Sequence, residues 1–287
     1  MGCHKMVIKI LIGYSSCPLT RTAFEHEGVE AWTCDLLPSR DGSPRHLQCD
    51  IWDVAHDTWD LAIFHPMCTY LTVSAAWAFT DGPYHQKVKP ETLVGAARRD
   101  ARENALDNFR RLLALPYPKA IENPAPSFIS KAIRPPDQTI QPYEFGDDAS
   151  KRTGLWLDRV PRLLPTKIIR GRLVEWPRES GKMVQRWANQ TDSGQNNLTP
   201  GANRWLKRST TYPGVAAAFG EQWGYKQVMF SADCDPDGNG WCNVRDVDPA
   251  ECDCYGPTQD GIEYMESDGI LYGRKISPEQ RSLDFTS

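Results

Sequence analysis

A short apolar run, residues 61–64 (LAIF), is the feature that most constrains how this chain folds. Asp60 precedes the run and His65-Pro66 follows it, which is typical of a buried strand that leads directly into a turn. Open α/β sheets carry their chemistry at the carboxyl ends of such strands. The turn holds one thiol, Cys68, which is therefore a candidate nucleophile. Because an isolated cysteine is more often a small buried hydrophobic residue, its role depends on what accompanies it.

The first 35 residues predict a strand, a turn, a helix and a second strand. Residues 6–14 are apolar and rich in β-branched side chains, residues 15–19 favour a turn, and residues 20–28 predict a short helix. The second strand, residues 29–34, ends at Asp35. In doubly wound sheets an acid about 20 residues past the turn accepts hydrogen bonds from the ribose of an adenosine cofactor. The glycine-rich fingerprint of such sites is absent, and an aspartate here is also a common turn former.

A second polar group follows a strand farther along the chain. Residues 119–121 predict a short strand that ends on Glu122 and Asn123. Since Cys68 also follows a strand, we expect Cys68 and Glu122 on the same edge of one sheet. The other predicted segments are an acidic stretch at 46–54, a loop at 80–95, an amphipathic helix at 96–115, irregular chain at 125–150, a strand at 153–157, irregular chain at 160–200 and a helix at 214–225.

Composition indicates a soluble globular protein. The chain has 287 residues, of which 40% are hydrophobic, enough for one large domain with an appendage or for two modest domains. No apolar run approaches the roughly 20 residues that span a bilayer, and the N-terminus lacks a signal-peptide pattern. We therefore expect no membrane partner and a cytoplasmic location.

The net charge of −4 conceals a basic middle and an acidic end. Residues 151–210 contain 13 Lys and Arg against 4 Asp and Glu, whereas residues 231–287 contain 4 against 13. A basic segment with Trp156, Trp187 and Trp205 suits a nucleic-acid face, because phosphates need cations and unpaired bases need flat partners. A solvated basic surface is the simpler interpretation of the same composition.

Four of the nine cysteines lie in the acidic end, at Cys234, Cys242, Cys252 and Cys254. Four thiolates suit a structural zinc ion, although the spacing is not that of a common zinc finger. The same stretch places Asp235, Asp237, Asn239, Gly240 and Asp246 at positions of a calcium-loop pattern. A polar turn without metal is the third interpretation.

Taken in order, these features resemble the DNA cytosine-5 methyltransferases, and more closely the compact members encoded by bacteriophages, over about residues 1–225. Cys68 matches the nucleophile of the family's Pro-Cys motif, Glu122-Asn123 its Glu-Asn motif, and Lys151-Arg152 a basic motif that contacts the target base. The resemblance implies a class I S-adenosylmethionine-dependent fold: an α/β, doubly wound, mostly parallel, Rossmann-like sheet with a small irregular recognition region and a Cys-rich tail.

The resemblance also implies the cofactor, S-adenosylmethionine, and its site. The first turn matches the family's first cofactor turn, Asp35 its ribose-binding acid and Asp50 its adenine-contacting acid, and residues 209–222 match a segment that returns to the cofactor. The implied cofactor-binding residues are Tyr14, Ser15, Ser16, Asp35, Leu36, Asp50, Ile51, Pro66 and Ser209.

In the implied reaction, the Cys68 thiolate adds to cytosine so that the neighbouring carbon, C5, becomes nucleophilic. Glu122 stabilises the adduct at the ring nitrogen by donating a proton or a hydrogen bond, which favours a raised pKa for its carboxyl group. Arg152 or Lys151 contacts the base carbonyl oxygen, and Asn123 shapes the turn. Because the ring is unreachable inside a duplex, the base is flipped out of the implied partner, double-stranded DNA.

The implied organisation is a catalytic core at 1–158, a basic DNA-recognition region at 159–208, a helix returning to the core at 209–230 and an acidic Cys-rich tail at 231–287. We expect a monomer, located in the host cytoplasm if the chain is phage-encoded, with restriction evasion or a first step in further base modification as its purpose. Two alternatives stay open: an enzyme that makes another C5 modification of a pyrimidine by the same thiol addition, and a catalytically inactive DNA-binding protein with this fold.

Overall fold

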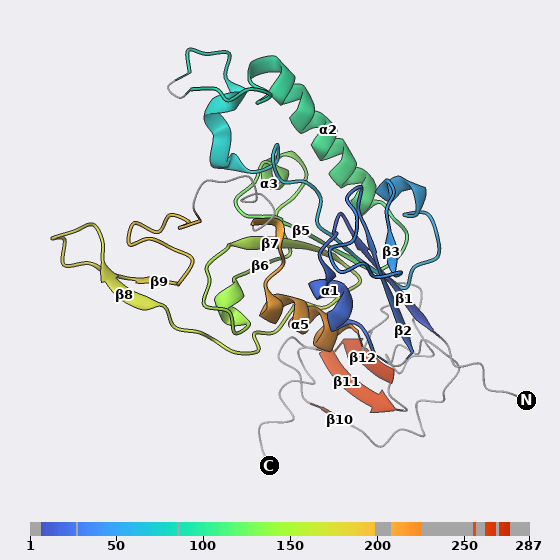
Figure 1. The fold of residues 1–287 in the computed structure, drawn as a ribbon. Coiled ribbons are helices and arrows are strands. Elements are labelled where there is room, and N and C mark those ends of the chain that lie inside the picture. The colour runs from blue at the N-terminus through green and yellow to red at the C-terminus, as the bar shows by residue number, and fades with distance from the viewer. Residues whose placement is uncertain are drawn as a thin grey trace, which may run out of the picture.

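A seven-stranded mixed sheet forms the centre of the molecule, with strand order β3-β2-β1-β4-β5-β7-β6 (Figure 1). The computed structural model describes residues 7–26, 28–84, 87–198 and 208–224 and the strands at 255–256, 262–267 and 270–275. The sheet strands are β1 (Ile8–Gly13), β2 (Val29–Cys34), β3 (His46–Leu47), β4 (Leu61–Phe64), β5 (Lys119–Pro124), β6 (Gln138–Ile140) and β7 (Thr153–Asp158).

Strands β1 to β5 pair in parallel, and β7 runs antiparallel to both of its neighbours, β5 and β6. The order 3-2-1-4-5 is that of a doubly wound sheet, in which the chain reverses its direction of winding between β1 and β4. The structure thus confirms the expected α/β fold with a mostly parallel sheet.

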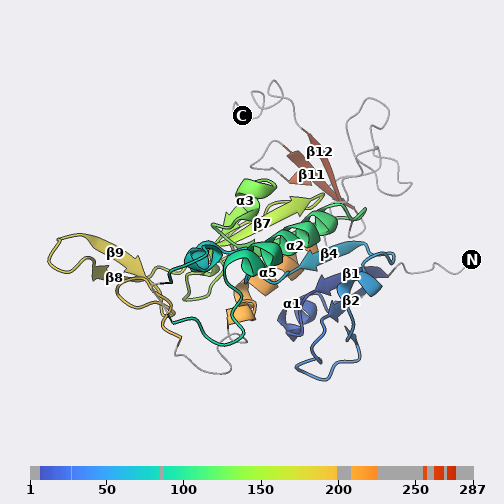
Figure 2. The same ribbon diagram turned by 90° about the horizontal axis from the view of Figure 1, so that it is seen from above.

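Helices cover both faces of this sheet (Figure 2). The α-helices are α1 (Pro18–Ala23), α2 (Gly95–Leu113), α3 (Ile129–Ala132) and α5 (Pro213–Trp223), and the 3-10 helices are η1 (Ile51–Asp53), η2 (Val73–Phe79) and η3 (Pro142–Glu144). Phe219 and Trp223 of α5 share one buried cluster with Ile63, whereas Phe109 of α2 shares the other with Phe64. The two clusters alternate along each strand because successive side chains of a strand point to opposite faces.

Two small antiparallel sheets complete the described structure. Strands β8 (Arg172–Glu175) and β9 (Met183–Arg186) form a hairpin that stands away from the central sheet in both views (Figure 1 and Figure 2). The C-terminal strands β10 (Tyr255–Gly256), β11 (Ile262–Ser267) and β12 (Ile270–Lys275) form the other. No helix among the described residues is long and apolar enough to cross a membrane.

The predicted bounds match closely for β2, β4 and α2. The prediction of irregular chain at 125–150 and at 160–200 was wrong in part, because these segments contain α3 and β6, and the β8–β9 hairpin, respectively. These elements have only three or four residues each. Runs that short give too little hydrophobic periodicity to identify a helix or a strand.

Close packing of α5 against α1 depends on Gly220. A Cβ atom at Gly220 would lie 2.0 Å from the carbonyl oxygen of Ala23, which is backbone and cannot swing aside. We predict that Gly220→Ala lowers the free energy of unfolding by about 1–3 kcal/mol, as overpacking does in tightly packed interiors. Urea denaturation followed by circular dichroism measures this change. Ala217→Ser, on the exposed face of the same helix, is the control, and an equal loss in both variants would contradict the packing argument.

Candidate active site

The carboxyl ends of β1, β4 and β5 meet at one edge of the sheet. Gly13 pairs with Phe64, and Phe64 pairs with Ile121, so that the residues which follow each strand lie side by side. The amide of His65 also donates to the carbonyl oxygen of Gly13 at 3.0 Å. This register brings the Tyr14 turn, the Cys68 turn and Glu122 to the same edge, as expected for adjacent parallel strands.

Glu122 is the centre of a buried polar cluster at this edge. His65 Nδ1 lies 2.5 Å from Glu122 Oε2, and Lys151 Nζ lies 3.5 Å from Oε1. The side chains of His65 and Glu122 are each 13% exposed, and that of Lys151 is 28% exposed. Both carboxylate oxygens therefore have a partner in a region from which most water is excluded.

The pKa of Glu122 shifts in the direction opposite to our expectation. Burial opposes ionisation of this carboxyl group, but the charge of Lys151 and the hydrogen bond and charge of His65 outweigh burial and hold its pKa well below the usual range. The prediction of a raised pKa was therefore wrong. The prediction took only the burial of the carboxyl group into account. It left out the hydrogen bond from His65, which lies 57 positions away in the sequence.

Cys68 lies half-buried in the turn after β4. The amides of Leu71 and Thr72 both donate to its carbonyl oxygen at 3.0 Å, which fixes the backbone of the turn. Burial raises the pKa of the Cys68 thiol, and Glu122 raises it further, whereas Lys151 and Arg208 oppose the shift. Lys151 thus acts on both Cys68 and Glu122, and Arg208 is a neighbouring charge that the sequence did not reveal.

Asn123 connects the end of β5 to the chain before Cys68. Its Nδ2 donates to the carbonyl oxygen of Pro66 at 3.0 Å, and Pro66 is itself buried. Asn123 Oδ1 and His65 Nε2 are buried without a hydrogen-bond partner in the described part of the chain. Two unpartnered polar atoms near one turn are uncommon, because an unsatisfied buried group costs about 1–3 kcal/mol.

The structure separates the two basic residues that the sequence left as alternatives. Lys151 reaches Glu122, whereas the Arg152 side chain is exposed and its backbone carbonyl oxygen accepts a hydrogen bond from Ala125 at 3.0 Å. Both residues directly precede β7, and it is Lys151 whose side chain contacts Glu122. Lys151 is accordingly the cation at the centre of the site.

A second residue missed by the sequence, Arg98, holds the chain that follows Cys68. Arg98 is only 4% exposed, and its guanidinium donates to the carbonyl oxygens of Thr69 at 3.1 Å and Leu93 at 3.2 Å. It also lies over the ring of Phe79, 4.8 Å from the ring centre. Arg98 stands three residues before Ala101, on the apolar side of the expected amphipathic helix, and this position was a signal for such a role, since arginine is seldom buried without partners.

The turn after β1 is well packed. Tyr14 adopts a φ of 59° and donates its hydroxyl to Asn108 Oδ1 at 3.0 Å, and burial raises its pKa to about 12. Ser15 and Ser16 are both buried, and the amide of Ser15 donates to the carbonyl oxygen of Cys34 at 3.0 Å. This turn therefore joins the ends of β1 and β2.

Asp35 and Asp50 lie at the same edge, after β2 and before η1. Asp35 Oδ1 accepts from the amide of Leu37 at 2.9 Å, and its other carboxylate oxygen has no hydrogen bond within the described residues. Asp50 Oδ1 accepts from the amide of Trp52 at 2.9 Å and caps η1. Beside them, Ile51 is buried and Leu36 is 69% exposed, which leaves an apolar side chain next to two carboxylates.

Ser209 returns to this edge from the C-terminal side of the described structure. Arg40 Nη2 donates to Ser209 Oγ at 3.5 Å, and Arg40 Nη1 donates to Thr210 Oγ1 at 3.0 Å. Arg40 lies in the connection between β2 and β3, so the chain before α5 contacts the loop that follows Asp35.

The four cysteines expected to bind zinc, and the overlapping calcium-loop pattern, lie outside the described residues. Within the described ranges, no group of three or more His, Cys, Asp or Glu side chains is arranged to hold a metal ion.

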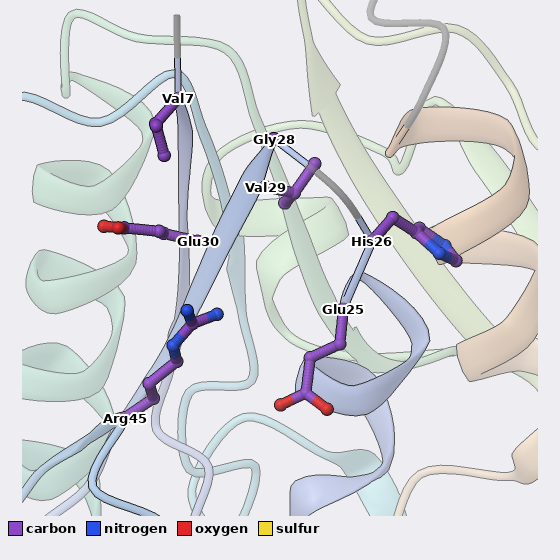
Figure 3. A pocket seen from close by; sticks show the side chains of 7 residues that line it. All are labelled: Val7, Glu25, His26, Gly28, Val29, Glu30 and Arg45. Atoms are coloured by element: carbon purple, nitrogen blue, oxygen red, sulfur yellow. The ribbon is translucent and has the colours of Figure 1, made fainter. Parts of the chain in front are cut away.

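A depression of about 460 Å³ lies at the opposite edge of the sheet, where β1 and β2 begin. Figure 3 shows its lining, which includes the charged side chains of Glu25, Glu30 and Arg45. It contains neither the thiol nor Glu122, so we assign the candidate active site to the carboxyl ends of the strands, where the reactive groups gather.

Comparison with models of known protein families gives no match for this chain, and comparison with curated proteins gives none either.

The ionised state of Glu122 predicts an acid-sensitive contribution to stability. A carboxylate whose folded-state pKa is depressed stabilises the protein above its unfolded-state pKa and loses this effect as the pH falls toward the folded-state value. We predict that Glu122→Gln lowers the free energy of unfolding by about 1–3 kcal/mol at pH 7, and that this difference shrinks below about pH 4. Urea titrations across this pH range measure it. Glu103→Gln, on the exposed face of α2, is the control, and a difference independent of pH would contradict the charge cluster.

Proposed function

We propose that this protein is a DNA methyltransferase that transfers a methyl group from S-adenosylmethionine to C5 of a flipped-out cytosine through a covalent adduct with Cys68. The observation that carries this proposal is the convergence of a thiol, a buried carboxylate and a lysine at the carboxyl ends of β4 and β5. The turn after β1 and two aspartates lie along the same edge of the sheet.

Cys68 supplies the nucleophile in this proposal. Its sulfur forms a bond to the ring carbon next to C5, and the electron pair of the ring double bond moves toward C5, which becomes nucleophilic. Lys151 offsets the negative charge that the ring gains. Because Glu122 is ionised, in this proposal it accepts a hydrogen bond from the exocyclic amino group of cytosine and does not donate a proton to the ring nitrogen.

The residues at the ends of β1, β2 and β3 fit an adenosine-containing cofactor. The unpartnered carboxylate oxygen of Asp35 suits a ribose hydroxyl, and exposed Leu36 offers an apolar surface for a flat ring. Ser209 contacts Arg40 in the loop that follows Asp35, and the Tyr14 turn is joined to the end of β2 just before Asp35. When bound, S-adenosylmethionine supplies an electrophilic methyl group.

The β8–β9 hairpin supports a DNA partner. Arg178 and Lys182 are exposed near its tip, and Leu173 and Met183 are 64% and 55% exposed on its strands. Exposed cations neutralise phosphates, and a two-stranded ribbon fits the major groove of B-DNA. We assign the hairpin to the recognition of double-stranded DNA around the flipped base, and the two exposed apolar side chains to contacts with base edges.

Two other functions use the same residues differently. An enzyme that delivers another group to C5 of a pyrimidine needs Cys68 but not an electrophilic methyl donor. A catalytically inactive DNA-binding protein needs neither the thiol nor the Glu122 cluster. Cofactor binding without a covalent DNA adduct favours the inactive protein, and an adduct without methyl transfer favours the other modification.

The nucleophile assignment is tested by incubating the purified protein with labelled S-adenosylmethionine and unmethylated DNA, followed by nucleoside mass spectrometry. We predict 5-methylcytosine with the wild-type protein and a loss of at least about 1,000-fold with Cys68→Ser, because a hydroxyl is a far weaker nucleophile. DNA affinity stays within about twofold, since the change is isosteric. Cys49→Ser is the matched control and retains methyl transfer. Substantial activity in Cys68→Ser would exclude Cys68 as the nucleophile.

The cofactor assignment is tested by calorimetry with each ligand separately. We predict that Asp35→Ala weakens binding of S-adenosylmethionine by about tenfold or more, the cost of losing a hydrogen bond to a charged group, and leaves DNA binding within about twofold. Asp57→Ala, an exposed aspartate before β4, is the control for the loss of one negative charge. Equal effects on both ligands would place Asp35 outside the cofactor site.

A further inference from the structure

The segment that follows the β8–β9 hairpin is joined to the chain that leads to Lys151. Trp187, the residue after β9, stacks on Tyr143, with ring centres 4.0 Å apart and ring planes 8° apart. The amide of Ala188 donates to Asp148 Oδ1 at 3.0 Å. The hairpin stands away from the central sheet (Figure 1), so these contacts connect its base to the loop before β7.

Asn189 pairs with the backbone of Ser150 in both directions. Asn189 Oδ1 accepts from the amide of Ser150 at 2.9 Å, and Asn189 Nδ2 donates to the carbonyl oxygen of Ser150 at 2.9 Å. Nδ2 also donates to the hydroxyl oxygen of Tyr212, just before α5, at 3.2 Å. Because an N–H faces the side-chain oxygen and a C=O faces the nitrogen, the orientation of the amide is determined. The two bonds hold the peptide groups on both sides of Ser150, and the second of these is the peptide bond to Lys151.

The Lys151 side chain depends on this support from the backbone. Lys151 Nζ lies 3.5 Å from Glu122 Oε1, and the Lys151 side chain is 28% exposed. A lysine has a long flexible stem and loses considerable rotamer freedom when it is held, so the direction in which it leaves the backbone decides which groups it reaches. On the other side of Lys151, its carbonyl oxygen accepts from Thr153 Oγ1 at 3.0 Å. The backbone at Lys151 is therefore held from both sides, by Asn189 and by Thr153.

We propose that Asn189 is a positioning residue, which fixes the peptide bond between Ser150 and Lys151 and so holds the Lys151 ammonium group beside Glu122. The inference rests on the proposed function, in which Lys151 offsets the negative charge that the base gains. Because Asn189 follows β9 closely, the same side chain couples the hairpin assigned to DNA recognition to the cation at the active site.

The first test uses the Cys68 thiol as a reporter of Lys151 in the protein without DNA or methyl donor. Lys151 and Arg208 lower the pKa of Cys68, whereas burial and Glu122 raise it. Reaction with iodoacetamide at pH 7, read by peptide mass spectrometry, measures how readily the thiolate forms. We expect Asn189→Ala to slow alkylation of Cys68 by about threefold or more, because a displaced ammonium group leaves fewer molecules with a thiolate.

A double-mutant cycle separates positioning of Lys151 from a general loosening of the loop. Lys151→Met keeps a long side chain without the charge, so in this background Asn189→Ala has no cation to displace and slows alkylation by less than about 1.5-fold.

Asn197→Ala is the matched control. Asn197 lies in the same segment, and its Nδ2 donates to the carbonyl oxygen of Ala188 at 2.6 Å, so this variant also removes a side-chain hydrogen bond there. We expect it to leave the alkylation rate unchanged. Circular dichroism verifies the fold of each variant, and Asn189→Ser, which keeps at most one of the two bonds to Ser150, takes the place of an alanine variant that does not fold.

The second test is methyl transfer to DNA by the same set of variants. Misplacing a group at the reacting centre by about 1 Å costs up to about 100-fold, so we expect Asn189→Ala to lower kcat by about 10- to 100-fold. KM for DNA stays within about threefold, because the hairpin keeps its own contacts. In the Lys151→Met background the further loss in kcat is less than about threefold. Wild-type rates in Asn189→Ala, or equal fold losses with and without Lys151, overturn the positioning role.

The two proposals fail separately. The alkylation cycle contains neither DNA nor methyl donor, so coupling between Asn189 and Lys151 in that assay, with no 5-methylcytosine formed, refutes the proposed function and keeps the positioning role. Formation of 5-methylcytosine with equal losses in the two backgrounds keeps the function and refutes the role of Asn189.

Discussion

Parallel pairing of β1, β4 and β5 is the constraint on which the rest of the site depends. Each of these strands is short and buried, and each ends at the same height in the sheet, so the residue that follows it reaches the same edge. Because the strands pack helices on both faces, this edge is the place where polar side chains can gather without disturbing the core. The thiol turn, the Glu122 cluster and the Tyr14 turn are consequences of that register.

At this edge of the sheet, the buried carboxylate of Glu122 is the group that the other polar side chains contact. Glu122 has little access to water and is stable as an ion because Lys151 and His65 bond its two oxygens. Removing either neighbour would leave one oxygen of a buried carboxylate without its partner, and breaking a buried ion pair costs several kcal/mol. The cluster therefore fixes two properties together: the charge of the Glu122 carboxyl group and the orientation of the His65 imidazole.

The sequence predicted the parts of this site that depend on local pattern. The strands β4 and β5 are apolar runs with clear ends, so Cys68 and Glu122 could be assigned to one sheet edge before any coordinates were known. The choice between Lys151 and Arg152 could not be made, because the two cations are adjacent in sequence and only the course of the chain before β7 decides which one reaches Glu122.

The partners of Glu122 could not be predicted from the sequence, because they lie far from it along the chain. His65 was recognised as the boundary of a strand and not as a functional group, and the pKa of Glu122 depends on side chains 29 and 57 residues distant. Contacts of this range arise from tertiary packing and leave no periodic signal. A histidine three residues before a candidate nucleophilic cysteine, at a strand end, was the one available clue.

The central claim is that Cys68 forms a covalent bond to the base, and the most direct measurement is to trap that bond. In DNA whose target cytosines are replaced by 5-fluorocytosine, the fluorine occupies the position from which a proton must leave, so the adduct cannot resolve. After incubation with such DNA and S-adenosylmethionine, the account predicts a protein–DNA complex that survives denaturation, with the modified nucleotide mapped to Cys68 by peptide mass spectrometry. A bond to another cysteine, or no bond while the protein methylates ordinary DNA, would contradict it.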